Sequence, residues 1–74
     1  MTYEVRHTSR FDRDFKKVPK DIKKRIYNKC EVLTSNPRAG KILKRRMGGL
    51  WSLRVGDYRV IYHISNKIVY LVAI

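Results

Sequence analysis

The sharpest pattern of apolar and polar positions covers residues 51–62, where two runs of alternating side chains flank Gly56-Asp57. A Gly-X pair between two such runs is typical of a two-residue hairpin turn of type II′. With Gly56 and Asp57 as the loop, Arg54 lies opposite Arg59 on one face of the hairpin. The apolar residues share the other face, in the directly opposed pairs Val55 with Tyr58, Leu53 with Val60, and Trp51 with Tyr62.

A second turn is predicted at Asn66-Lys67, after which the chain is again apolar. Pairing across this turn adds a third strand whose apolar side chains fall on the same face as those of the hairpin. Two separately assigned turns therefore give one consistent core face, while the opposite face is mixed and basic at one end. The predicted pairs are Ile64 with Val69, Tyr62 with Leu71, and Val60 with Ala73.

Two amphipathic helices are predicted in the first half of the chain. Ser9 and Asp12 resemble a capping box that opens the first helix, and Pro19 ends it because proline lacks an N–H group. The second begins near Lys20-Asp21, where Asp21 can bond free N–H groups, and stops at Asn36-Pro37. Apolar residues line one face of each helix: Phe11, Phe15 and Val18 in the first, and Ile22, Ile26, Cys30 and Leu33 in the second.

Residues 3–7 alternate between apolar and charged or polar side chains, which predicts a short strand before the helices. The element order is then β-α-α-β-β-β. This is an α+β fold in which a helix hairpin packs on one face of a small, mainly antiparallel sheet. No repeat or linker interrupts the chain, so we expect residues 1–74 to form a single domain.

Charge is the unusual feature of the composition, because the hydrophobic share of 43% is ordinary for a folded protein. Lys and Arg number 18 against 6 Asp and Glu, which gives a net charge of +12. A field of that sign favours polyanionic partners, such as RNA, DNA, the ribosome, an anionic membrane surface or an acidic protein. Of these we expect a nucleic acid or the ribosome.

Cysteine usage and apolar segments bear on the compartment. Cys30 is the single cysteine and cannot form an internal disulfide, which fits a reducing compartment. We expect it to be a packed core residue rather than a reactive thiol. No stretch approaches the roughly 20 apolar residues that cross a bilayer, and the N-terminus lacks a signal peptide's apolar segment. We therefore expect a cytoplasmic protein with no membrane partner. The few, separated His, Cys and carboxylate residues predict no metal site and no cofactor.

The Arg54–Arg59 pair is the first candidate for chemistry. Like charges directly opposite each other destabilise a strand pair by a few tenths to about 1 kcal/mol, and a bound anion would relieve this cost. The planar guanidinium group matches phosphate oxygens, so the pair is a candidate phosphate clamp. The alternative is that both side chains extend into solvent without a ligand.

A basic segment over residues 38–47 leads to Gly48-Gly49. As a solvated, partly extended connector it needs no special explanation. As a functional element it would follow the phosphate backbone of RNA through electrostatic attraction. Its position relative to the Arg54–Arg59 face decides between these alternatives. The candidate phosphate-binding residues in it are Lys41, Lys44, Arg45 and Arg46.

Residues 50–62, with the sequence LWSLRVGDYRVIY, resemble the RelE/ParE toxin superfamily of bacterial and archaeal toxin–antitoxin systems. The resemblance covers nearly the whole chain, including the helix break at Val18-Pro19 and the segment Asn36-Pro37-Arg38. It implies the same β-α-α-β-β-β fold. It also implies a toxin that, in the RelE branch, enters the ribosomal A site and cleaves mRNA by attack of a ribose 2′-OH on the adjacent phosphate.

The resemblance places the candidate catalytic residues on the exposed face of the sheet. Arg59 matches the family's arginine, and Arg54 occupies the position of a catalytic lysine in some members. Arginine stays protonated, so both can stabilise negative charge but cannot move protons. His63 is the side chain on this face that exchanges a proton near neutral pH, and it is the third catalytic candidate. Its ordinary alternative is an exposed histidine opposite Tyr70.

The sequence departs from the family pattern in two further places. Ser52 replaces a lysine found in some RelE proteins and supplies no positive charge. The chain also ends at Ile74, before the glycine, basic or histidine residue, arginine and frequent final tyrosine with which RelE-type proteins typically continue. We therefore expect a RelE-like scaffold with an incomplete active site, either naturally short and weakened or trimmed from a longer toxin.

Two other functions stay open. A ParE-like toxin would poison DNA gyrase through protein contacts and needs no nuclease residues, whereas a non-enzymatic remnant would bind an antitoxin or coat RNA. All three predict a cognate antitoxin, acidic or amphipathic, lying across the basic surface and the apolar edges of the sheet or helix hairpin. The leading function adds the ribosome and mRNA as partners, and operator DNA would be contacted only through the antitoxin.

Overall fold

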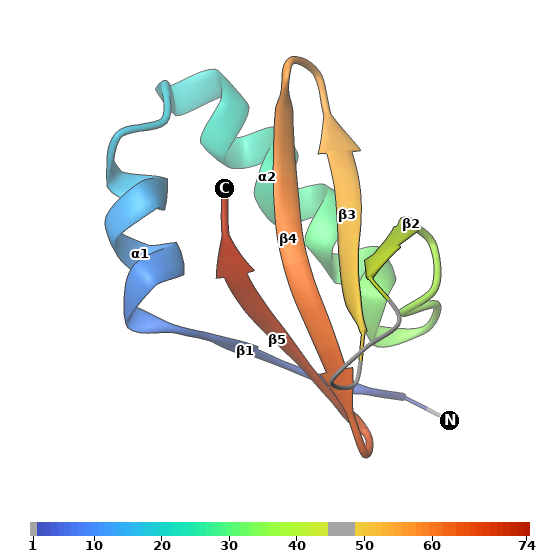
Figure 1. Ribbon diagram of the computed structural model, residues 1–74. Coiled ribbons are helices and arrows are strands. Elements are labelled where there is room, and N and C mark those ends of the chain that lie inside the picture. Colours follow the sequence, from blue (N-terminus) through green and yellow to red (C-terminus); the bar gives the residue numbers. More distant parts are fainter. Residues whose placement is uncertain (1, 45–48) are drawn as a thin grey trace.

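The structure, a computed structural model, describes residues 2–44 and 49–74 and orders them into five strands and two helices, with a short 3₁₀ turn (Figure 1). None of the described helices is long and apolar enough to span a bilayer. The elements are β1 (Glu4–His7), α1 (Ser9–Lys16), α2 (Lys20–Glu31), the 3₁₀ segment η1 (Val32–Thr34), β2 (Lys41–Lys44), β3 (Leu50–Val55), β4 (Tyr58–Ser65) and β5 (Ile68–Ala73).

One sheet contains all the described strands, in the order β1-β5-β4-β3-β2. β1 runs parallel to β5, and the other neighbouring pairs are antiparallel. Both helices pack on the same face, with α2 behind the sheet in Figure 1 and α1 next to β5. The predicted α+β class is confirmed. β2 adds one strand to the predicted order, formed by four residues of the basic connector.

The β3–β4 hairpin has the predicted register, with Arg54 opposite Arg59 and Trp51 opposite Tyr62. Gly56 adopts a φ of +61°, the left-handed value that a type II′ turn requires at its first loop position. The Gly56-Asp57 turn therefore determines which side chains of β3 and β4 face the core.

The β4–β5 pairing follows the prediction only near its turn. Tyr62 lies opposite Leu71 and Ile64 opposite Val69, as predicted. Ala73, however, lies opposite Ile61 and not Val60, because the register shifts between Ile61 and Tyr62. An extra residue on one strand, a β-bulge, moves every later pair by one position. Ala73 is nevertheless buried, although it is not a member of the hydrophobic core cluster.

The core lies between the helices and one face of the sheet. Ile26 of α2 is 1% exposed, and Leu33 of η1 together with Val60, Tyr62 and Val69 of the sheet is fully buried. The apolar helix faces that the sequence predicts are the faces that pack against the sheet. Phe11, Val18 and Cys30 are also buried in this cluster, and Phe15 and Ile22 pack against it while remaining partly exposed.

The helix starts differ from the prediction. Thr8, not Ser9, is the N-cap of α1, because its Oγ1 accepts a bond from the Phe11 N–H at 3.2 Å and donates to the Leu71 carbonyl at 2.9 Å. The hydroxyl thus joins the start of α1 to β5, a tertiary contact that local spacing does not reveal. Asp21 does not cap α2 either: the N-cap position is Pro19, and no side chain bonds the free N–H groups there.

Replacing Thr8 with alanine should lower the free energy of unfolding by about 1 kcal/mol, because both hydroxyl bonds are lost. Thr8→Ser keeps the hydroxyl and should stay within a few tenths of a kcal/mol of the parent protein. Urea unfolding followed by circular dichroism measures both variants. Equal unfolding midpoints for the alanine and serine variants would contradict a capping role for Thr8.

Candidate functional site

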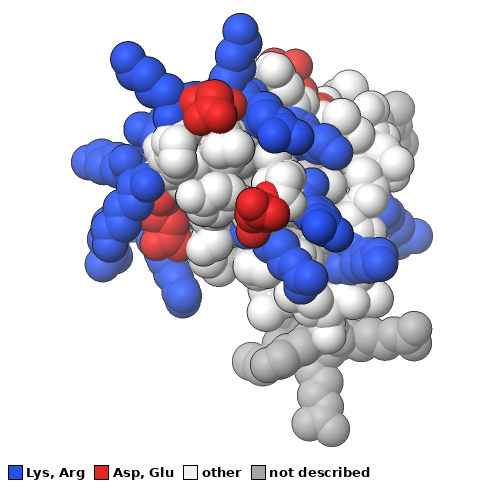
Figure 2. Space-filling model, turned by 90° about the horizontal axis from the view of Figure 1, so that it is seen from above, with Lys and Arg blue, Asp and Glu red and all other residues white. Residues whose placement is uncertain are grey.

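The open face is the side of the sheet that the helices leave uncovered, and it is turned toward the viewer in Figure 1. Because side chains alternate along a strand, its members follow from the strand register. Seen from the end that carries the β3–β4 turn, Lys and Arg side chains spread widely over the surface with few acidic ones between them (Figure 2). Along the strands, the open face carries Arg6, Lys41, Ser52, Arg54, Arg59, Ile61, His63 and Tyr70.

Arg54 and Arg59 form a cross-strand pair, and both side chains are exposed. The Nε of Arg54 donates to the carbonyl oxygen of Gly56 at 3.2 Å, so this side chain leans toward the hairpin turn. Neither guanidinium forms an ion pair with a described carboxylate. Their positive charges are therefore not neutralised within the described chain, and a phosphate group could take the place of a missing acidic partner.

Lys41 stands next to this pair, on β2. It lies directly opposite Ser52, which is two positions from Arg54 on the same face of β3, so Lys41 and Arg54 are diagonal neighbours about 7–8 Å apart. Residues 41–44 of the basic segment thus form a sheet strand beside the arginine pair. Lys44 ends β2, but its side chain and all of Arg45 and Arg46 lie outside the described residues.

Tyr62 holds the loop that positions Lys41. Its hydroxyl donates to the carbonyl oxygen of Pro37 at 2.7 Å and accepts from the N–H of Gly40 at 3.1 Å. The side chain is fully buried, and desolvation raises the pKa of its phenol above the usual value despite the bond from Gly40. The loop before β2 is therefore anchored from within the core.

His63 lies farther along the open face. It is four residues after Arg59 on β4, which corresponds to about 13 Å along the strand. Its Nδ1 is 3.0 Å from the carbonyl oxygen of Gly49, which can only accept, so Nδ1 carries a proton. The structure brings Arg54, Arg59 and Lys41 together, whereas it places His63 beside Tyr70 and away from the arginine pair.

Arg6 was not selected from the sequence, yet it lies on the open face beside Tyr70 of β5. Glu4 bonds the Arg6 guanidinium and raises its pKa above the ordinary value. The parallel β1–β5 pairing that brings Arg6 here joins the two ends of the described chain, and no turn in the sequence indicates it. In the local sequence, only the alternation of Glu4 and Arg6 around Val5 indicates on which face of the sheet Arg6 lies.

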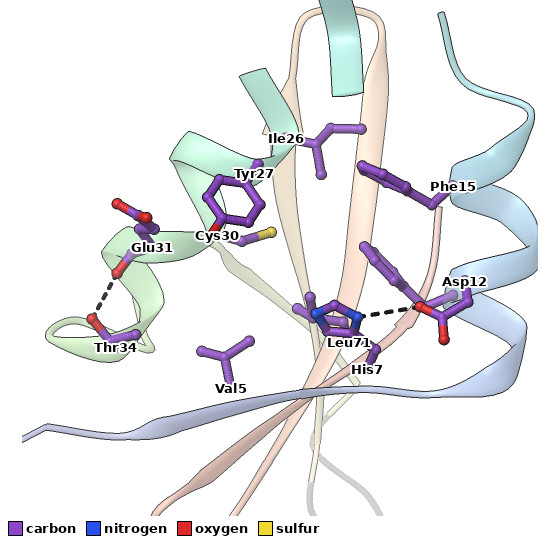
Figure 3. A pocket seen from close by; sticks show the side chains of 11 residues that line it. Val5, His7, Asp12, Phe15, Ile26, Tyr27, Cys30, Glu31, Thr34 and Leu71 are labelled. Atoms are coloured by element: carbon purple, nitrogen blue, oxygen red, sulfur yellow. Dashed lines mark hydrogen bonds and ion pairs between the residues drawn. The ribbon is translucent and has the colours of Figure 1, made fainter. Parts of the chain in front are cut away.

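A second feature, the helix groove, lies on the helix side of the sheet. It is a cavity of about 440 Å³ between α1, α2, β1 and β5 (Figure 3). On its wall, Nδ1 of His7 and a carboxylate oxygen of Asp12 lie 3.2 Å apart, within hydrogen-bond distance. Tyr27 of α2, which is 64% exposed, also lines the groove. The groove is otherwise mainly apolar, lined by Val5, Phe11, Phe15, Ile26, Cys30 and Leu71.

Cys30 lines this groove as a core residue. Desolvation raises the pKa of its thiol to about 11, so the group stays neutral at physiological pH. The predicted packing role is confirmed by its burial. Among residues 2–44 and 49–74, no three His, Cys, Asp or Glu side chains gather closely enough to hold a metal ion.

Known proteins are similar to this chain in sequence and in fold. A family model described as the ParE toxin of the type II toxin–antitoxin system parDE matches residues 5–74. Toxin RelG of Mycobacterium tuberculosis is 36% identical over 69 residues, which is 90% of this chain and 79% of that protein. A chain of the archaeal RelE–RelB complex from Pyrococcus horikoshii OT3 has a TM-score of 0.86 and 25% identity, covering 99% of this chain and 92% of that one. A chain of the toxin–antitoxin complex RelBE2 from Mycobacterium tuberculosis has a TM-score of 0.84 and 33% identity, and the match covers 96% of this chain and 93% of that one.

Proposed function

The chain belongs to the ParE toxin family of type II toxin–antitoxin systems, within the RelE/ParE superfamily, and from that premise we propose that it is an endoribonuclease that cleaves mRNA on the ribosome. The observation that carries the proposal is the cluster of Lys41, Arg54 and Arg59 on the open face of the sheet. Three positive charges without a described acidic partner are suited to a phosphodiester and its surroundings.

The proposed reaction is attack of a ribose 2′-oxygen on the adjacent phosphorus, which forms a 2′,3′-cyclic phosphate and releases the 5′-oxygen of the next nucleotide. Negative charge builds up on the phosphate oxygens in the transition state, and Arg54 and Arg59 stabilise it there. Lys41 contributes a third cation, and Lys44, Arg45 and Arg46 extend the basic segment along the RNA. The target would place the protein in the cytoplasm.

Proton transfer requires groups other than the two arginines. The 2′-OH must lose a proton and the leaving oxygen must gain one, and arginine does neither. His63 is the catalytic candidate with an imidazole, the side chain that most often acts as general acid or base, but it is about 13 Å along β4 from Arg59. Lys41 belongs to the cluster itself, so among the described residues it is a proton donor nearer to the arginine pair than His63.

Induced expression followed by mapping of mRNA 5′ ends tests the proposed cleavage. We expect new ends in phase with codons, and binding to 70S ribosomes that weakens steeply with salt as phosphate contacts release counterions. Absence of new mRNA ends together with failure to co-sediment with ribosomes at low salt would reject the proposal.

A second candidate function is inhibition of DNA gyrase. It is favoured by the match to the ParE family model and by Ser52, which leaves β3 without a lysine that could move protons. Gyrase supercoiling measured with saturating protein distinguishes the two functions, because a ribosome-dependent nuclease would leave supercoiling unchanged.

We also propose that an antitoxin covers this chain, since the RelE–RelB and RelBE2 structures are toxin–antitoxin complexes. The helix groove offers a mainly apolar cavity, with Asp12 and Glu31 as its acidic lining residues, which fits the apolar face of an amphipathic segment of the antitoxin; acidic residues of the antitoxin would contact the basic surface elsewhere. Contact with operator DNA would then be made through the antitoxin rather than by this chain.

A further inference from the structure

His63 and Tyr70 place two aromatic rings side by side on the open face. They are a cross-strand pair of β4 and β5, with ring centroids 6.3 Å apart and ring planes inclined by 24°. Both side chains are partly exposed, and neither belongs to the core cluster. The bond from Nδ1 of His63 to the Gly49 carbonyl limits rotation of the histidine ring. The pair is therefore an ordered aromatic surface on the side of the sheet away from the helices.

Positive charge without a described acidic partner lies on one side of this ring pair. The Arg54–Arg59 pair is about 13 Å along the strands toward the hairpin turn, whereas Arg6, next to Tyr70 on β1, is ion-paired with Glu4. A single-stranded nucleic acid presents flat bases and a chain of phosphates, and proteins that bind it combine cationic grooves with stacking rings. The distance between the rings and the arginine pair is too long for both to contact one nucleotide, but a strand of a few nucleotides can span it.

We propose that the His63–Tyr70 pair is a stacking site for a base of single-stranded RNA, one or more nucleotides away from the phosphate that Arg54 and Arg59 hold. The inference rests on the proposed RNA function and adds a base-binding site to it. It assigns His63 a positioning role, in which the ring and its bond to Gly49 matter and proton exchange does not.

The test compares two labelled probes of about eight nucleotides, a single-stranded RNA and an abasic oligonucleotide of the same length. Tyr70→Ala should weaken binding of the RNA roughly 5- to 150-fold, the equivalent of one lost base stack, and leave binding of the abasic probe unchanged. Tyr70→Phe should bind both probes like the parent. Tyr27→Ala is the matched control, because Tyr27 is an exposed tyrosine on α2, on the helix side.

His63→Phe separates stacking from proton transfer, since it keeps a ring and removes the exchangeable proton. Because phenylalanine also loses the bond to the Gly49 carbonyl, we expect RNA binding and mRNA cleavage to fall together and in the same proportion, with binding of the abasic probe unchanged. Loss of cleavage with unchanged RNA binding would overturn the positioning role and make His63 a catalytic residue.

Other outcomes distinguish this inference from the proposed function. Equal weakening of both probes by Tyr70→Ala, or no weakening of either, would overturn the stacking site while leaving the nuclease proposal standing. Base-dependent binding that requires Tyr70, in a protein that cleaves no mRNA, would support the stacking site and reject the nuclease. Unfolding midpoints of the Tyr70 variants show whether a loss of binding reflects a loss of folding.

Discussion

Gly40→Ala should destabilise the protein by roughly 3 kcal/mol or more. A Cβ atom on Gly40 would lie 2.3 Å from the carbonyl oxygen of Ser52 and 2.8 Å from the hydroxyl oxygen of Tyr62. Neither atom can easily move, because Ser52 belongs to the paired strand β3 and Tyr62 is fully buried. The methyl group must therefore displace the loop before β2, which would also break the bond from the Gly40 N–H to Tyr62.

Chemical unfolding of Gly40→Ala alongside Gly56→Ala tests this explanation. Gly56 has a positive φ of 61°, but a Cβ there would meet only Arg25 Nη1, at 3.6 Å. Gly56→Ala should therefore show the backbone strain alone, about 1 kcal/mol. If the two variants are destabilised equally, close packing is not what requires glycine at position 40.

Arg59→Ala should reduce mRNA cleavage about 100-fold or more while making the protein slightly more stable. The loss of activity follows from removing a cation that stabilises the charge developing on phosphate. The gain in stability, a few tenths to about 1 kcal/mol, follows because Arg54 would no longer face a like charge across the ladder. Cleavage rates on translating ribosomes and urea midpoints measure the two effects separately.

Arg13→Ala is the control for this prediction, since Arg13 is an exposed arginine of α1 and its loss changes the net charge equally. Cleavage should remain close to the parent level. A similar loss of activity in both variants would mean that bulk charge, rather than the pair on the sheet, is responsible. A lower stability of Arg59→Ala would show that the two arginines do not repel each other.

Much of the fold could be predicted because local chemistry determines it. The Gly56-Asp57 turn sets the β3–β4 register, and the helical spacing of Ile26 and Leu33 identifies the face that packs on the sheet. The features that were missed depend on distant contacts. Lys41–Lys44 has two adjacent apolar residues between lysines, which is not an alternating strand pattern, and it becomes a strand by pairing with β3. The Thr8 cap likewise depends on β5.

The same distinction applies to the site. The Gly56-Asp57 turn places Arg54 opposite Arg59, and the Asn66-Lys67 turn places His63 opposite Tyr70. The place of Lys41 beside Arg54 could not be predicted, because it depends on an edge strand held by Tyr62 through Pro37 and Gly40. Sequence reasoning also grouped His63 with the arginines because all three share a face, but strand rise separates them along it.

The pairing of β1 with β5 has a consequence for how the molecule forms during synthesis. Residues 4–7 leave the ribosome early, but their parallel partners are residues 68–71, so the sheet cannot close around them until β5 has been made. Such non-local pairing is slow to form because a long stretch of chain must first be ordered. Arg6 joins Tyr70 only at that late stage. A protein proposed to attack ribosomes would thus acquire its complete RNA-facing surface only after the ribosome that makes it has synthesised β5.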